Sequence, residues 1–131
     1  FKLVSRLCDK IRKNRHKIIR YEGLWLDDAD VVMVAYGIVY RSAKAAVKRA
    51  REEGLKVGLL RPVTLWPFPE EVMADVGERA RKVLVAEANY GQLVREVQRW
   101  VDYRKVVFLP KLGEFFHTAE ELLTALRSAA R

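Results

Sequence analysis

Four short apolar runs set the strongest limit on what this chain can fold into. They are residues 31–36, 57–60, 83–86 and 106–109. None of them alternates apolar with polar residues, which is typical of strands that are buried on both faces of a sheet. Helical patterns separate the runs, and such alternation favours right-handed crossovers between parallel strands. We therefore predict an α/β fold in three layers, with helices on both faces of a mainly parallel sheet.

Apolar stripes at helical spacing lie between and after these runs, and residues 21–26 are predicted to add a further strand. Gly54 follows the first stripe and predicts a left-handed helix cap. Thr118 and Glu121 precede the last stripe at the spacing of a capping box. The stripes are Ala43, Ala46, Val47 and Ala50; Val72, Met73, Val76 and Ala80; Leu93, Val94, Val97, Trp100 and Val101; and Leu122, Leu123, Leu126 and Ala129.

The basic charge of the chain is concentrated in its first twenty residues. The whole sequence has a net charge of +8, and residues 1–20 account for +7 of it. Apolar residues within 2–20 fall near one helical stripe, so this segment is predicted to be a basic helix. We interpret its charges as a solvated helix face. The alternative is contact with nucleic-acid phosphates, although the segment lacks the interleaved aromatics of a single-strand binder.

Composition narrows the class of protein further. The 131 residues suit one domain with a real core. The only cysteine, Cys8, excludes an internal disulfide and a four-thiolate cluster site within one copy, and a reducing, cytoplasmic setting fits. No apolar run approaches the roughly 20 residues of a membrane span, so we expect no membrane partner. Abundant charge with few Asn and Gln residues resembles the composition of thermophile proteins.

The strand ends carry little that resembles an active site. The segment after residue 36 has one glycine, which fits neither a dinucleotide nor a triphosphate cradle. Glu87, Asn89 and Tyr90 follow the third run, without a nucleophile–base pair beside them. We expect Glu87 to be hydrogen-bonded locally, with Asn89 shaping the turn; the alternative is a subunit or domain contact. His16 and His117 lie far apart in sequence, and we interpret His117 as a loop contact rather than a metal ligand.

The segment "RPVTLWPFP" (61–69) joins a predicted strand to a predicted helix through three prolines. Proline restricts both its own backbone and that of the preceding residue, so the segment is predicted to be a rigid connection. Pro69 suits the first turn of the next helix. Trp66 and Phe68 either cover the core of this domain or fill a pocket on a neighbour. The pattern leaves open whether Trp66-Pro67 or Phe68-Pro69 is cis.

Several of these segments together carry a family resemblance. They are "VAYG" (34–37), "RSAKAAVKRAREEGLKVGLLRPVTLWPFP" (41–69), "VLVAEANYGQLVREV" (83–97) and "KLG" (111–113). In this order and spacing they resemble the C-terminal domain of the alpha subunit of 2-oxoacid:ferredoxin oxidoreductases, and more distantly the C-terminal domain of transketolases. The resemblance spans residues 21–131. Residues 1–20 resemble the basic helical connection from a preceding domain.

The resemblance implies a three-layer, transketolase C-terminal-domain-like fold of about five strands, one of them antiparallel, for which 21–26 is the candidate. It implies an enzyme that converts a 2-oxoacid, coenzyme A and oxidised ferredoxin to acyl-CoA, carbon dioxide and reduced ferredoxin. Thiamine diphosphate, Mg²⁺ and iron–sulfur clusters would be bound by other domains and subunits. This chain would have no catalytic, cofactor-binding or metal-ligating residues, and would assemble with the preceding domains of the alpha subunit and with other subunits. The candidate contact residues are Arg61, Trp66, Phe68, Glu87, Asn89 and Tyr90.

Two alternatives of other classes stay open at this point. One is a free-standing module that binds a polyanion through residues 2–20. The other is a regulatory domain that binds a small ligand at the strand ends near Gly37 and Glu87.

Overall fold

A five-stranded sheet organises the fold in a computed structural model that describes residues 1–113 and 115–131. The strand order is β1-β3-β2-β4-β5, and only β1, at one edge, runs antiparallel to its neighbour. The strands are β1 (Tyr21–Leu24), β2 (Val31–Ala35), β3 (Val57–Pro62), β4 (Lys82–Glu87) and β5 (Val106–Pro110). The predicted sheet is confirmed, including the antiparallel strand within 21–26. That strand ends at Leu24 because Trp25 adopts a positive φ of 51° and turns the chain.

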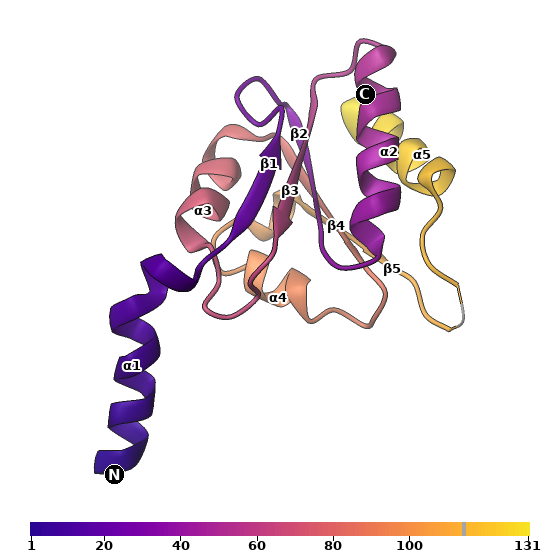
Figure 1. Cartoon of the computed structure of the whole chain (residues 1–131). Coiled ribbons are helices and arrows are strands. Elements are labelled where there is room, and N and C mark those ends of the chain that lie inside the picture. The colour runs from indigo at the N-terminus through magenta and orange to yellow at the C-terminus, as the bar shows by residue number, and fades with distance from the viewer. Residues whose placement is uncertain (114) are drawn as a thin grey trace.

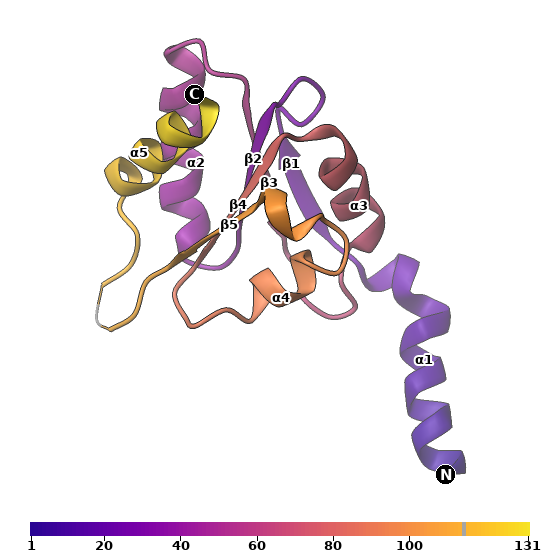
Figure 2. The same cartoon turned by 180° about the vertical axis from the view of Figure 1, so that it is seen from behind.

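Helices cover both faces of the sheet, as predicted. α2 and α5 lie on one face, and α3 and α4 lie on the other, while α1 stands away from the body (Figures 1 and 2). The predicted glycine cap has a φ of 84° at Gly54, and the predicted capping box joins Thr118 to Glu121. The helices are α1 (Lys2–Ile18), α2 (Val39–Glu52), α3 (Glu70–Arg79), α4 (Leu93–Val97) and α5 (Ala119–Ala130), with a 3-10 turn, η1, at Tyr103–Lys105.

The central strand β2 explains why the apolar runs do not alternate. All five of its residues are buried. Met33 packs with Leu84 and Leu123 on the α2–α5 face. Val34 packs with Met73 on the α3–α4 face. Each residue of β2 therefore faces one of the two cores. A polar side chain on either face would lose its hydration without gaining a hydrogen bond in return.

The stripe 93–101 is shorter as a helix than predicted, because α4 ends at Val97. The chain then bends onto α3, where the Trp100 carbonyl oxygen would lie 2.9 Å from a Cβ placed on Gly77. Val101 still reaches the same core. Tertiary packing thus buries the end of the stripe without continuing the helix, and glycine at 77 allows the two backbones to approach.

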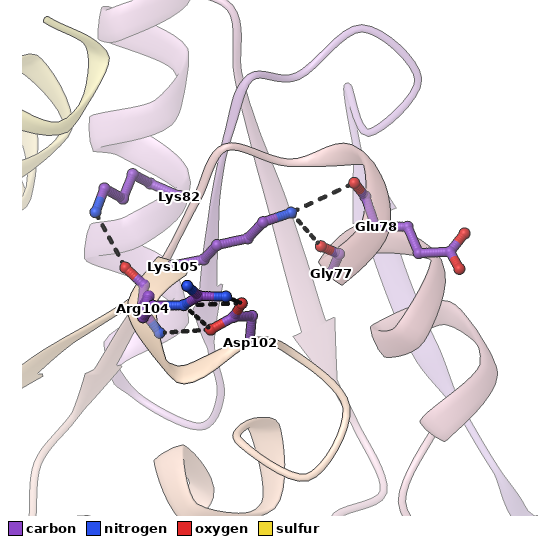
Figure 3. Close-up of polar contacts among 6 residues, drawn as sticks. All are labelled: Gly77, Glu78, Lys82, Asp102, Arg104 and Lys105. Atoms are coloured by element: carbon purple, nitrogen blue, oxygen red, sulfur yellow. Dashed lines mark hydrogen bonds and ion pairs between the residues drawn. The ribbon is translucent and has the colours of Figure 1, made fainter.

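A polar cluster lies at the amino ends of β4 and β5, opposite the carboxyl ends of the parallel strands (Figure 3). The Lys105 ammonium donates to the carbonyl oxygens of Gly77 (2.8 Å) and Glu78 (3.4 Å), at the end of α3. The Lys82 ammonium donates to the carbonyl oxygen of Arg104 at 3.2 Å. These bonds tie the turn before β5 to both α3 and β4.

Asp102 completes this cluster as the cap of η1. Its Oδ1 accepts from the backbone N–H of Arg104 at 3.0 Å, and its Oδ2 accepts from the Arg104 guanidinium at 2.6 Å (Figure 3). These hydrogen bonds lower the pKa of Asp102 to about 2. The ionised form is thus the one that the fold stabilises.

Candidate functional site

The carboxyl ends of β2, β3 and β4 bring the predicted contact residues to one edge of the sheet. At this edge of an open parallel sheet, ligands and partners usually bind. Trp66 is 72% exposed and Tyr90 83% exposed, and Ile38 and Leu65 are exposed beside the same strand ends. Contiguous groups of such side chains mark interaction surfaces. We call Ile38, Leu65, Trp66 and Tyr90 the carboxyl-edge surface.

The segment 61–69 divides its two aromatic residues between core and surface. Phe68 is only 6% exposed and packs with Met73 in the core under α3. Trp66 points outward, and its peptide bond to Pro67 is cis. For Phe68, the core interpretation is confirmed. Pro69 occupies the N-cap position of α3, one residue earlier than the predicted position in the first helical turn, and makes no side-chain cap.

Backbone hydrogen bonds hold the beginning of this loop against the residues that follow α1. The carbonyl oxygen of Arg20 accepts from the N–H groups of Val63 (2.9 Å) and Thr64 (3.1 Å). The Thr64 hydroxyl accepts from the N–H of Arg20 at 2.8 Å. The loop that presents Trp66 is therefore fixed at its start by backbone bonds, which side-chain substitutions elsewhere do not remove.

Glu87 uses both carboxylate oxygens to begin α4. The side chain is fully buried, and its oxygens accept from the backbone N–H groups of Leu93 (2.6 Å) and Val94 (2.9 Å). These N–H groups belong to the first helical turn and have no partner within their own helix. The local role expected for Glu87 is confirmed, and it leaves the carboxylate no water-accessible atom for catalysis.

Asn89 fills the gap between the ends of β2 and β4. Its Oδ1 accepts from the N–H groups of Gly91 (2.7 Å) and Gln92 (3.2 Å), which confirms that it shapes the turn. Its Nδ2 donates to the Tyr36 hydroxyl at 3.2 Å. Burial, together with the nearby Glu87 carboxylate, raises the pKa of Tyr36. The polar groups at this point bond one another, so the geometry does not favour a small-ligand site here.

A groove of about 260 Å³ lies beside these residues, lined by Tyr36, Leu65, Phe68, Gln92, Leu93 and Glu96. Its one carboxylate, Glu96, is paired with Arg99 at 3.2 Å. Within the part of the chain that the structure describes, no three His, Cys, Asp or Glu residues are grouped so that they could hold a metal ion. The groove therefore offers shape and apolar area rather than acid–base chemistry.

Arg61 lies in a cluster whose other members the sequence does not reveal. Its guanidinium is 4.5 Å from the centre of the Tyr40 ring, and its Nη1 donates to Glu22 Oε1 at 3.3 Å. The Tyr40 hydroxyl donates to Glu22 Oε2 at 3.0 Å, and burial and this carboxylate raise the pKa of Tyr40. Glu22 faces Arg61 because β1 pairs with β3 in that register. Arg61 thus fastens the edge strand to α2.

His117 and His16 lie in different surroundings. His117 is buried, and its Nε2 lies 2.8 Å from the carbonyl oxygen of Leu109, which confirms the expected loop contact. His16 is exposed on α1. Among residues 1–113 and 115–131, no helix is long and apolar enough to cross a membrane.

These observations define an α/β domain with exposed apolar side chains beside the carboxyl ends of its strands. The chain belongs to the family of the pyruvate:ferredoxin oxidoreductase core domain II, whose family model matches residues 29–122. It is 44% identical over 126 residues to the 2-oxoglutarate synthase subunit KorA of Methanothermobacter marburgensis, across 95% of this chain and 34% of that protein. The chain thus spans about a third of the length of the curated relatives that it matches.

Two solved structures share the fold. A 2-oxoglutarate:ferredoxin oxidoreductase from Magnetococcus marinus superposes with a TM-score of 0.86 at 24% identity, over 99% of this chain and 23% of that chain. A split-gene transketolase superposes with a TM-score of 0.67 at 21% identity, over 85% of this chain and 41% of that chain. The predicted relationship to the 2-oxoacid:ferredoxin oxidoreductases and the predicted transketolase-like fold are confirmed.

Proposed function

We propose that this chain is the C-terminal, noncatalytic assembly domain of a 2-oxoacid:ferredoxin oxidoreductase alpha subunit. The observation that carries the proposal is the contrast at the carboxyl edge of the sheet. There the polar side chains of Glu87 and Asn89 are used within the fold, while Trp66 and Tyr90 are exposed. Exposed aromatic residues on a rigid support are the usual anchors of a protein–protein contact.

In this proposal residues 21–131 form the assembly domain and residues 1–20 form the connection from a preceding domain. The neighbours of the domain are the preceding domains of the alpha subunit and the other subunits. Thiamine diphosphate, Mg²⁺ and the iron–sulfur clusters belong to those parts of the enzyme. Ferredoxin and coenzyme A act on the whole assembly. We expect the enzyme to be cytoplasmic, and the composition of this chain is like that of thermophile proteins.

The whole enzyme would decarboxylate a 2-oxoacid oxidatively to an acyl-CoA and pass the electrons to ferredoxin. 2-Oxoglutarate is the first substrate to test, because the relative from Methanothermobacter marburgensis is a 2-oxoglutarate synthase subunit. Ferredoxin reduction by the complete enzyme would be compared with 2-oxoglutarate, pyruvate and 2-oxoisovalerate. The isolated chain is expected to show no turnover. Tight binding of thiamine diphosphate to the isolated chain in a calorimetric titration would contradict this division of roles.

A substitution of Trp66 tests the assembly role. In the natural oxidoreductase, Trp66→Ala should weaken assembly by about 2 kcal/mol, the usual loss at an aromatic anchor, which is roughly thirtyfold in affinity. Native mass spectrometry and size-exclusion chromatography would measure the assembled fraction. Tyr103→Ala is the matched control, because Tyr103 is equally exposed but lies on η1 at the opposite edge of the sheet.

The melting temperature of the isolated chain separates an effect on assembly from an effect on folding. The proposal expects that Trp66→Ala folds like the wild type and fails to assemble. Equal loss of assembly in both variants, or loss of folding in Trp66→Ala alone, would contradict the proposed contact.

A further inference from the structure

The helix α1 has an apolar side that nothing described in this chain covers. It runs for 17 residues without a buried residue, and Figures 1 and 2 show it standing away from the sheet. Val4 is 63% exposed and Leu7 53% exposed. Most helical stability in proteins comes from packing an apolar face against a neighbour. The apolar side of α1 is therefore available for packing against a partner.

The apolar face of α1 contains a heptad row. Val4, Leu7, Ile11 and Ile18, with the polar Asn14 between the last two, lie at alternating spacings of three and four residues, and Leu3 and Cys8 flank this row. Such an a/d seam fits a neighbouring helix. α1 has no Trp, Tyr or Phe, whereas helices that lie on membranes usually carry aromatic residues on the apolar face. We call the five residues of the row, Asn14 included, the α1 seam.

One polar residue interrupts the α1 seam at a d position. The amide of Asn14 donates to the carbonyl oxygen of Lys10 within the same helix at 2.7 Å. The remaining hydrogen-bonding groups of this amide would need partners once the seam is buried. A polar residue in such a seam therefore favours some alignments of the two helices over others.

The charges beside the α1 seam are not symmetrical. Lys10 and Lys17 occupy the positions that flank it on one side. On the other side Arg15 is already paired with Glu70 at 3.0 Å and Glu71 at 2.6 Å, both at the start of α3. The cations available to a partner are therefore on the lysine side, where carboxylates on that partner would meet them.

The same charges argue against a second copy of α1 as the partner. Residues 1–20 have a net charge of +7, so two copies would repel each other. An antiparallel pair would also place Lys10 of one copy close to Lys17 of the other, and like charges at these flanking positions disfavour pairing.

We infer that the α1 seam packs against an α-helix of another domain or subunit of the oxidoreductase, one that carries Asp or Glu side chains opposite Lys10 and Lys17. The inference rests on the proposed assembly role and adds to it the kind of partner and the side that it approaches. Continuity with the body supports it, because Arg15 and Arg20 fix the end of α1 to α3 and to the loop before Trp66.

Charge reversal on the two sides of α1 tests the inference. The tagged chain would be co-expressed with the remaining polypeptides of the natural oxidoreductase, and capture would be measured as a dissociation constant. K10E/K17E reverses the charges beside the seam. K2E/R12E reverses two on the outer face and leaves the Lys13–Asp9 ion pair in place, so both variants change the net charge equally. K10E/K17E should weaken capture at least tenfold, and K2E/R12E less than twofold. Circular dichroism would show that both variants stay folded.

The outcomes separate this inference from the proposed function. Failure of the wild-type chain to capture the other polypeptides would overturn the assembly role and the inference with it. Normal capture of the wild type with equal losses in both variants, or with no loss in either, would overturn only the helical partner. Binding of the wild-type chain to phosphatidylserine vesicles, with capture unchanged in K10E/K17E, would assign α1 to a membrane surface instead and also overturn it.

A photo-cross-link gives a second measurement that does not depend on charge. In the assembled enzyme, Leu7→p-benzoylphenylalanine places the reactive group in the α1 seam, and the same replacement at His16 places it on the outer face. Only the first should form a cross-link to another polypeptide, and the linked peptide should have Asp or Glu residues at heptad spacing. A cross-link from His16 should stay within this chain, because His16 lines a hollow with Pro69 and Glu71. Cross-linking to another polypeptide from His16 but not from Leu7 would overturn the inference.

Discussion

The sheet body and α1 both carry apolar stripes, but the two stripes differ in how far they are buried. In the body, every residue of β2 is buried and the carboxylate of Glu87 has both oxygens bonded. In α1, no residue is buried, and Leu3, Val4 and Leu7 are exposed. The difference shows that an apolar stripe in the sequence does not reveal whether the stripe is buried within the same chain. The apolar stripes of the body are buried within this chain, whereas no residue of α1 is buried within it.

The largest effect should come from removing the same side chain in the two regions. Leu84→Ala deletes a fully buried side chain from the core under α2 and α5, and should lower the free energy of unfolding by about 2–5 kcal/mol. Leu3→Ala on α1 deletes an exposed one, and should change it by no more than about 0.5 kcal/mol. Urea unfolding of the isolated chain measures both. Similar losses would show that α1 is packed in the isolated chain and would remove the contrast.

A smaller effect should follow when a buried acceptor in the body is replaced. Glu87→Gln keeps the shape of the side chain, but its amide nitrogen faces a backbone N–H of α4 that then has no acceptor. The free energy of unfolding should fall by about 1–3 kcal/mol. Glu96→Gln is the control, because it changes a partly exposed carboxylate on the same helix. Equal losses in the two variants would mean that Glu87 does not hold the start of α4.

The smallest effect should appear in the dependence of stability on pH. The pKa of Asp102 in the folded chain is about 2, below its ordinary value of 3.8, because Arg104 bonds its ionised form. The stabilisation is therefore fully present above about pH 4 and is lost as the pH falls through 2. Asp102→Asn, which can still cap η1, should show a shallower decline in urea midpoint between pH 4 and 2. Parallel curves for variant and wild type would contradict this contribution.

The fold could be predicted from the sequence because its strongest signals are local. Four unbroken apolar runs predict strands buried on both faces, and Gly54 and the Thr118–Glu121 box mark helix ends through contacts of a few residues. The helix 93–101 was overpredicted, since its periodicity cannot show that the chain bends onto Gly77 after Val97. That bend depends on a contact with α3, which lies far away in the sequence.

The contact surface could be predicted only in part for the same reason. Trp66 and Phe68 each stand before a proline, and the local pattern does not separate them. Only the packing of α3 against the sheet decides that Phe68 enters the core and Trp66 stays in water. Tyr40 and Glu22 were missed because their contact with Arg61 depends on the register of β1 on β3. The roles of Arg61, Trp66 and Tyr90 as contacts with a neighbouring protein remain predictions.

The hydrogen bonds that join Arg20 with Val63 and Thr64 have a consequence for avidity. They hold the start of the Trp66 loop close to the end of α1, so the α1 seam and the carboxyl-edge surface are fixed on one body. For a neighbour that reaches both, binding at the first makes binding at the second intramolecular, with an effective concentration that can reach the millimolar range. Two individually weak attachments then multiply rather than compete, and loosening the Arg20 junction would uncouple them without removing a single atom from either surface.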